Sequence, residues 1–410
     1  MSAHPVQVPL PLGFRAHVAN VGIKDGTDDL VIVASETPCT SVAVFTRSRF
    51  AGPSVVVSRS NASRGDLRAA VVVSKNANVA TGAEGLSNAH ELGRGVARAV
   101  GCDENEVLIT STGVIGRQYP MDRVRAHLDL LASAAATRAD LAQNDLFTTI
   151  DALAVATAMM TTDTHPKSAT ASTACTGPDG TPGTATLVGV AKGVGMIEPD
   201  MATMLAFVFT DAALPADSLG RSFRTAVDHT FNSLSVDTDT STSDTAAILA
   251  NGRAGTVDPD EFAAALHQVC LDLTRQLAND GEGATKLLVV EVHQARDEDQ
   301  ARRVAKAVLN SPLVKTAVHG ADPNWGRVAM AVGKCSDDTD IDEERVRIRF
   351  GDAEVYPTSV GDEELGALEK YLGGDEVLIS IDLGIAGSTW TVYGCDLSDG
   401  YVRINADYTT

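Results

Sequence analysis

The fold of this chain is constrained most by how its β-branched runs and alanine-rich segments are grouped along the sequence. Short apolar runs bounded by turn residues are typical of strands, and we expect strands at 30–33, 42–45, 55–57, 71–73, 107–109, 287–292, 346–350, 377–382 and 390–395. Alanine-rich segments with helical periodicity predict helices at 84–100, 121–136, 138–160, 219–232, 259–279 and 299–309. Because strands and helices come in clusters and do not strictly alternate, the pattern predicts an α+β fold and not a doubly wound parallel sheet.

One stretch, at 168–184, is rich in Gly, Pro and Thr. Its centre reads Thr176-Gly177-Pro178-Asp179-Gly180, and such clusters are typical of surface loops and linkers. We therefore expect it to be the least regular part of the chain. The length of 410 residues favours two to three domains.

The acidic composition excludes several classes of function. The chain has 33 Lys and Arg against 54 Asp and Glu, a net charge of −21. Proteins that bind nucleic acid or anionic membranes use Lys and Arg to neutralise phosphates, so we expect neither partner. No apolar run approaches the roughly eighteen residues that a membrane span needs. The N-terminus lacks a signal-peptide pattern and the six cysteines include no C-x-x-C pair, which predicts a reduced, cytoplasmic protein.

The common cofactor and metal motifs are missing from the sequence. The Gly193 and Gly281 segments each lack the third glycine of a dinucleotide fingerprint, and Gly333-Lys334 lacks the rest of a phosphate-binding loop. The acidic run 237–244 has no glycine at its sixth position, which argues against a calcium loop. The histidines form no H-E-x-x-H motif. We therefore expect no cofactor and no metal.

The most unusual segment is 191–207, where a Gly-rich, Pro-marked turn leads into Ala202-Thr203 and then an apolar run. Such a turn can hold a peptide bond in a strained geometry. The Thr203 hydroxyl could then attack the carbonyl of Ala202, and hydrolysis of the resulting ester would give chains 1–202 and 203–410. The new α-amine of Thr203, with a reference pKa of about 7.7–8.0, could act as the base for its own hydroxyl.

Within this segment, the run 195–205 resembles the self-cleavage signature of the ornithine acetyltransferase (glutamate N-acetyltransferase) family. Further motifs resemble the same family in order along almost the whole chain, at 13–16, 110–116, 160–164, 235–244, 279–284, 311–317, 322–327 and 401–410. The resemblance implies a four-layer α/β/β/α sandwich built jointly by both chains, with two α and two β chains in a heterotetramer.

The resemblance also implies a role for each matching residue. Thr203 would be the nucleophile for self-cleavage and acetyl transfer, and Thr112 and Gly113 would form the oxyanion hole. The implied substrate-binding residues are Thr161, Lys192, Thr203, Glu282, Asn405 and Thr410. Taken without the resemblance, Thr112-Gly113 reads as a turn after a strand, and Lys192 and Glu282 read as solvated loop charges.

The implied reaction is a ping-pong transfer of the acetyl group from N2-acetyl-L-ornithine to L-glutamate, in arginine biosynthesis or a related specialised pathway. Three alternatives stay open: a bifunctional enzyme that also uses acetyl-CoA, a processed amidohydrolase or aminopeptidase, and a non-catalytic amino-acid-binding protein. The acidic composition offers no evident basic site for CoA phosphates, which favours the single-activity transferase. The chain departs from the common family pattern at Glu198, Asp200, Thr238 and Ser243, and the two carboxylates could change the preferred donor or acceptor.

Overall fold

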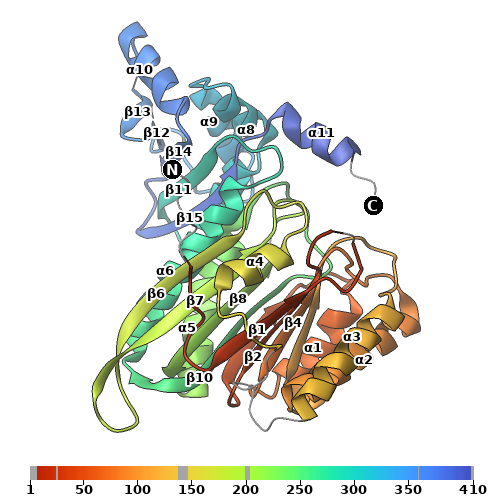
Figure 1. Cartoon of the computed structure of the whole chain (residues 1–410). Helices are drawn as coiled ribbons and strands as arrows, with labels where there is room; N and C mark the ends of the chain where they lie inside the picture. Colours follow the sequence, from red (N-terminus) through yellow and green to blue (C-terminus); the bar gives the residue numbers. More distant parts are fainter. Residues whose placement is uncertain (1–6, 25, 137–145, 199–203, 359, 408–410) are drawn as a thin grey trace, which may run out of the picture.

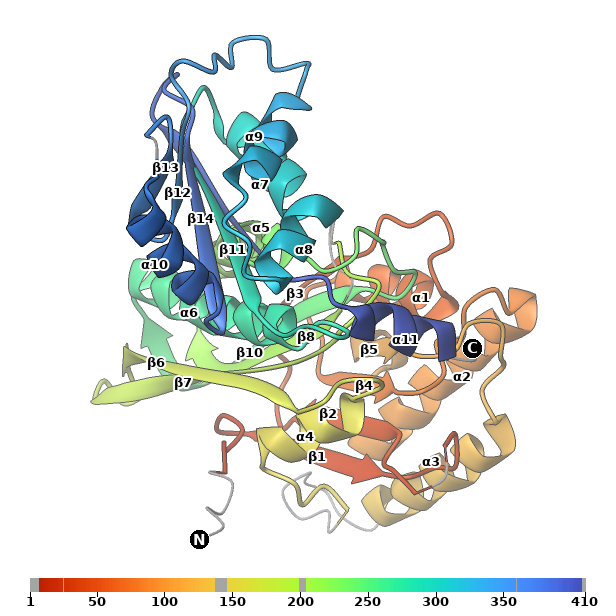
Figure 2. The same ribbon diagram turned by 90° about the horizontal axis from the view of Figure 1, so that it is seen from above.

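The described residues form three β-sheets with helices between and outside them (Figures 1 and 2). The structure is a computed structural model that describes residues 7–24, 26–136, 146–198, 204–358 and 360–407. Helices and strands occur in clusters, as the sequence pattern predicted, and the α+β class is confirmed.

The first sheet has the order β1-β2-β4-β5, made of Phe14–Ala19, Leu30–Ser35, Ala69–Val73 and Val107–Ser111. Its strands are antiparallel except for the parallel pair β4 and β5. Every residue of β2 and β4 is buried because both faces of this sheet are covered. On one face, Ile32 and Val71 pack with Leu92 and Leu128 of helices α2 (Gly82–Val100) and α3 (Met121–Ala136).

The second sheet covers the other face of the first. Its order is β3-β10-β6-β7-β8, with a further pairing of β10 and β8, and its strands are Thr40–Phe45, Thr245–Val257, Lys167–Thr176, Pro182–Lys192 and Leu205–Ala213. Val31 and Val72 of the first sheet share a core with Val188 and Phe207 of the second. Helices α5 (Ala216–His229) and α6 (Pro259–Asn279) pack on the outer face of the second sheet.

A third sheet lies beyond these four layers, on the far side of α6. Its order is β13-β12-β14-β11-β15-β9, from Ala353–Tyr356, Arg347–Phe350, Glu376–Asp382, Leu287–Ala295, Ser388–Cys395 and Leu234–Ser235. Val289 and Tyr393 face α6, and Val290 and Val392 face a separate core. The helices of that core are α7 (Glu298–Leu309), α8 (Pro312–His319), α9 (Trp325–Gly333) and α10 (Asp362–Leu372).

Three sequence predictions of secondary structure were wrong. Residues 55–57 lie in helix α1 (Pro53–Ala62), because Pro53 at the first helical position favours helix and outweighs the strand preference of three valines. The helix expected at 138–160 is described only as α4 (Ala152–Met159), which begins where Asp151 accepts a hydrogen bond from the Leu153 N–H. Residues 137–145 lie outside the described residues.

The third wrong prediction concerns the stretch 168–184. It forms most of the long hairpin β6-β7, and only residues 177–181 are a turn, closed by a hydrogen bond from the Gly177 N–H to the Thr181 carbonyl. The threonines that suggested a loop are β-branched, and they suit a strand whose side chains alternate between the two faces.

The other expected strands and helices occur within a few residues of their predicted bounds. All six cysteines are free thiols. Within the described part of the chain, no helix is long and apolar enough to cross a bilayer.

Candidate active site

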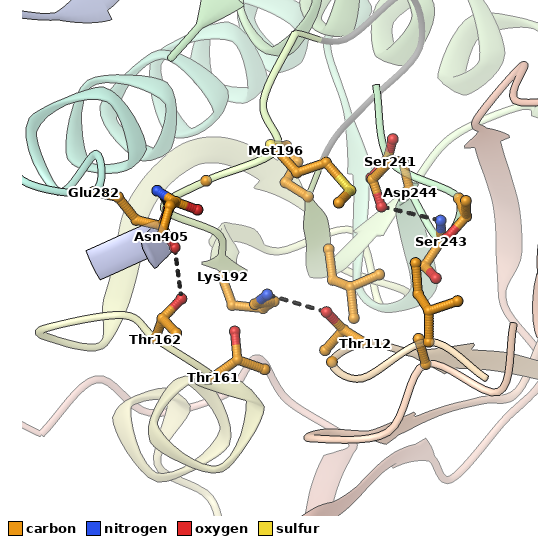
Figure 3. Close-up of a pocket in the computed structure, with 17 residues that line it drawn as sticks. Thr112, Thr161, Thr162, Lys192, Met196, Ser241, Ser243, Asp244, Glu282 and Asn405 are labelled. Carbon is orange, nitrogen blue, oxygen red and sulfur yellow. Dashed lines mark hydrogen bonds between the residues drawn. The ribbon is translucent and has the colours of Figure 1, made fainter. Parts of the chain in front are cut away.

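A cavity of about 300 Å³ opens where the ends of several elements meet (Figure 3). Thr112 and Gly113 follow β5, Lys192 ends β7, and Thr161 follows α4. The described residues that line it are Ala77, Thr112, Gly113, Ile115, Thr161, Thr162, Lys192, Gly195, Met196, Met204, Leu205, Ser241, Thr242, Ser243, Asp244, Glu282 and Asn405. The structure thus brings into one cavity six residues that the sequence analysis selected: Thr112, Gly113, Thr161, Lys192, Glu282 and Asn405.

The other selected residues, Ala202, Thr203 and Thr410, lie outside the described residues. Met204, the residue after Thr203, is buried and lines the cavity. Its carbonyl accepts a hydrogen bond from the Thr245 N–H at 3.0 Å, where β8 begins beside β10. Met204, the first described residue after 199–203, therefore lies in the wall of the cavity.

The centre of the cavity holds a contact between an ammonium and a hydroxyl. Lys192 Nζ donates a hydrogen bond to Thr112 Oγ1 at 3.1 Å (Figure 3). A hydroxyl that accepts through its lone pair still has its own proton to donate. The Thr112 proton is therefore available to an oxygen of a bound ligand, and the adjacent positive charge strengthens it as a donor.

Gly113 is at this position because nothing larger fits. Its φ of 126° belongs to the region that favours glycine. A Cβ atom at Gly113 would lie 2.4 Å from the carbonyl carbon of Lys75 and 2.6 Å from the Lys75 Cα. The turn after β5 therefore packs directly against the backbone that follows β4.

Glu282 gives one end of the cavity a carboxylate (Figure 3). Thr162 Oγ1 donates to Glu282 Oε1 at 3.3 Å, and Asn405 Nδ2, on helix α11 (Asp399–Asp407), donates to Oε2 at 2.9 Å (Figure 3). Both donors are neutral, and among the described residues Glu282 forms no ion pair. Gly195 lets the carboxylate approach, since a Cβ there would lie 2.4 Å from Oε2. The negative charge is therefore available to an ammonium group.

Burial and neighbouring opposite charges shift the pKa values of Lys192 and Asp163 in opposite directions. Burial lowers the pKa of Lys192, and Asp163 is the strongest of the carboxylates that oppose this shift. Burial alone would raise the pKa of Asp163, but Lys192, Lys167 and the hydrogen bonds from Lys167 and Gly193 outweigh it and lower that pKa to about 2. Asp163 therefore stays ionised beside the cavity at any ordinary pH.

Several cavity residues were not selected from the sequence. Thr162, Met196, Ser241, Ser243 and Asp244 line the space, and Met196 lies across from Lys192 in Figure 3. Four of them fall inside the motifs 160–164 and 235–244, and Met196 falls inside 195–205, but nothing in one sequence tells which member of a motif faces a cavity. Ala77, Ile115, Met204 and Leu205 give the lining an apolar part.

Glu198, which we expected to influence substrate choice, does not line the cavity. Its carboxylate accepts hydrogen bonds from Asn310 Nδ2 at 2.7 Å and Ser235 Oγ at 3.1 Å, and it pairs with Lys306 Nζ at 3.3 Å. These partners hold the Glu198 carboxylate outside the cavity lining, so we expect no contact between it and a ligand in the cavity. Asp200, the other unusual carboxylate, lies outside the described residues.

The cavity of this layered fold brings together a hydroxyl, an ammonium and a carboxylate, groups that suit a small ligand with both charged and polar ends. The family with the description "ArgJ family" matches residues 15–410. This chain belongs to the ArgJ family, and the predicted class of acyltransferase is confirmed.

Three similar proteins illustrate the relationship. "Glutamate N-acetyltransferase Oat2" of Streptomyces clavuligerus is 56% identical over 98% of this chain and 98% of its own length. "Arginine biosynthesis bifunctional protein ArgJ" of Rhodococcoides fascians is 53% identical over 98% of this chain and 94% of its own. A crystal structure of ornithine acetyltransferase with ornithine, from Mycobacterium tuberculosis, is 31% identical, covers 48% of this chain and 98% of that chain, and has a TM-score of 0.37.

Proposed function

We propose that this enzyme moves the acetyl group of N2-acetyl-L-ornithine to L-glutamate through an acetyl-Thr203 intermediate. The observation that carries the proposal is the cavity in which Lys192 and Thr112 face Glu282, with Met204 in its wall. A relative of nearly equal length, 56% identical, is named a glutamate N-acetyltransferase, which supports the acceptor.

The first step is self-cleavage between Ala202 and Thr203. Thr203 Oγ attacks the Ala202 carbonyl carbon, the acyl group moves from nitrogen to oxygen, and water hydrolyses the ester. The products are the Ala202 carboxylate and a free Thr203 α-amine. With a reference pKa of about 7.7–8.0, this amine can accept the proton of its own hydroxyl near neutral pH.

The two half-reactions then use one pocket. Thr203 Oγ attacks the acetyl carbonyl carbon, the Thr112 hydroxyl and the Gly113 N–H stabilise the oxyanion, and ornithine leaves as its α-amine takes the proton. Glutamate attacks the acetyl ester in the reverse sense and restores the Thr203 hydroxyl. Glu282 and Asn405 hold the amino-acid end, together with Thr161, Lys192 and Thr410. A missing oxyanion donor typically costs about 2.7–4 kcal/mol of transition-state stabilisation.

Intact mass spectrometry tests the cleavage and the intermediate together. The purified protein should give two chains, 1–202 and 203–410, and addition of acetylornithine without glutamate should add one acetyl group to 203–410. The Thr203→Ala variant should stay a single chain of 42.7 kDa and transfer no acetyl group. A wild-type protein that remains one uncut chain, with no N-terminus at Thr203, would refute the mechanism.

A second candidate is a bifunctional enzyme that also accepts acetyl-CoA. One relative at 53% identity is named an arginine biosynthesis bifunctional protein, which is compatible with a second activity but does not name it. The cavity lining contains a single cationic side chain, Lys192, among the residues described. We therefore expect acetyl-CoA to be a poor donor. Assays with each donor decide this, and release of free acetate in place of acetylglutamate would indicate an amidohydrolase.

We also propose that the two chains stay together after cleavage and assemble as a heterotetramer of two α and two β chains. Pairing of β7 with β8 across the cleavage point supports the association of the two chains within one unit. Light scattering on the cleaved protein would give a mass of two copies of each chain, and the mass of a single pair would contradict this assembly.

A further inference from the structure

A buried cluster of charges lies directly behind the cavity. Lys167 is fully buried, and its Nζ lies 2.8 Å from Asp163 Oδ1 and 2.5 Å from Asp280 Oδ2. Asp280 also accepts hydrogen bonds from the Thr164 N–H and hydroxyl. Burying three charged groups is costly even when they are paired, and apolar side chains could fill the same space at less cost. The presence of this cluster therefore suggests a role other than packing.

Asp163 is the member of this cluster that reaches the cavity walls. Its Oδ1 accepts a hydrogen bond from the Gly193 N–H at 2.7 Å, directly after Lys192. Its Oδ2 accepts one from the Thr161 N–H at 3.0 Å. One carboxylate thus joins the end of β7 to the loop after α4, and both segments line the cavity.

We propose that Asp163 is a positioning residue for acyl transfer: its carboxylate fixes the end of β7 so that the Lys192 ammonium keeps its charge and its hydrogen bond to Thr112. This inference rests on the proposed acetyl transfer and assigns Asp163 no contact with substrate. Lys167 has the complementary role. It neutralises part of the Asp163 charge and holds that carboxylate in place through the 2.8 Å contact.

The charges around Lys192 make the proposal testable by pH. Asp163, Asp244 and Glu282 favour the charged form of Lys192, whereas burial and Lys167 oppose it. Lys192 loses its proton as the pH rises, so its titration gives an alkaline limit to activity. Removing the Asp163 charge should move that limit to lower pH, and removing the Lys167 charge should move it to higher pH.

The first experiment compares Asp163→Asn, Lys167→Met and the wild type in cleaved form, with kcat and KM measured from pH 6 to pH 10. Neighbouring charges typically shift a pKa by about one to three units, so we expect Asp163→Asn to lower the alkaline limit by about one unit or more and to reduce kcat about tenfold. Lys167→Met should raise the limit. A purely structural role predicts shifts of the same sign or none, and either result would overturn the proposal.

Asp280→Asn is the matched control, because Asp280 pairs with the same Lys167 but bonds neither Thr161 nor Gly193. It should destabilise the protein about as much as Asp163→Asn does. Its alkaline limit should stay closer to that of the wild type. If both variants moved the alkaline limit equally, Asp163 would act on Lys192 no differently from Asp280, and the proposal would be wrong.

A second measurement does not depend on cleavage or activity. The 13Cε resonance of Lys192 in lysine-labelled full-length protein, identified by its loss in Lys192→Arg, reports the protonation of Lys192 directly. A lower midpoint in Asp163→Asn than in the wild type supports the proposal, and an unchanged midpoint refutes it. If the wild type itself forms no acetyl-enzyme, the proposed function fails while this titration still decides the role of Asp163.

Discussion

Two glycines that line the cavity have different neighbours: Gly113 lies against backbone and Gly195 against a side chain. Their alanine variants should therefore have different effects. Gly113→Ala would force a Cβ into the Lys75 backbone at a positive φ, and strain of this kind costs about 1–3 kcal/mol. We expect a lower melting temperature and a kcat reduced at least a hundredfold, since the Gly113 N–H, which we propose as an oxyanion donor, would move. Gly195→Ala would displace only the flexible Glu282 carboxylate. It should raise KM for acetylornithine about tenfold and leave the melting temperature nearly unchanged.

Gly366→Ala is the control for both glycine variants. Gly366 lies in α10, and a Cβ there meets no atom within 4 Å. Alanine at an unstrained helical position typically stabilises by about 0.4–1 kcal/mol, so activity should be unchanged. Steady-state kinetics and thermal denaturation separate the three variants, and a Gly195→Ala enzyme with wild-type KM would contradict the role of Glu282.

The sequence could predict Thr112, Lys192 and Glu282 as site residues only through family resemblance. They are far apart in the chain and lie at or just after the ends of three different elements, and no local pattern indicates that their side chains converge. Asp163 was missed for a related reason. A carboxylate in a Thr-rich loop usually faces solvent, and only the packing shows that Lys167, Thr161 and Gly193 surround it.

The segment between β7 and β8 is held on its N-terminal side by residues of the second half of the chain. The N–H groups of Met196 and Ile197 donate to the Asp237 carboxylate at 2.6 and 2.7 Å. Asn310 and Lys306 bind the Glu198 carboxylate. Fixing this segment limits the conformations open to the bond that we propose is cleaved.

Glu198→Ala should therefore slow self-cleavage. Hydrogen bonds to charged groups contribute about 1.5–3 kcal/mol, and a loss of about 1.4 kcal/mol from the oriented state corresponds to a tenfold slower reaction. Time courses of newly synthesised protein on denaturing gels measure the rate. Glu376→Ala, which removes the exposed pair with Arg275, should cleave at the wild-type rate. Equal rates for the wild type and Glu198→Ala would show that this anchor does not act on cleavage.

Secondary structure was predictable wherever apolar periodicity and burial agreed. Helix α6 has the bounds predicted from its helical pattern, and its buried residues do recur at helical spacing. The structure adds that Asp258 caps its first turn. The errors occurred where two local signals disagree. Residues 55–57 lie in helix α1 because Pro53 at its first position favours a helix, which then packs on β5. The threonines of 168–184 lie in the β6-β7 hairpin because their β-branched side chains suit paired strands.

The whole molecule interleaves the two halves that cleavage would separate. Residues Leu187–Lys192 of β7 pair with Leu205–Thr210 of β8, and β3 pairs with β10 over six residues. Their cores are also shared, since Val188 and Val190 pack with Phe207 and Phe209. Neither half could bury its apolar surface alone, so the two should fold and unfold as one cooperative unit.

We therefore expect the cleaved chains to elute together in gel filtration without denaturant and to separate only when the sheets unfold. Urea denaturation followed by circular dichroism and by tryptophan fluorescence should give coincident transitions. The far-UV signal reports on all three sheets, and the two tryptophans, Trp325 and Trp390, report on the third sheet, whose other face packs on α6. The uncut Thr203→Ala chain is the control. At equal protein concentration it should unfold at a higher urea concentration than the cleaved protein. Its midpoint should also rise less steeply with protein concentration, because fewer separate chains have to associate. Elution of 203–410 apart from 1–202 in native buffer would contradict this interleaved arrangement.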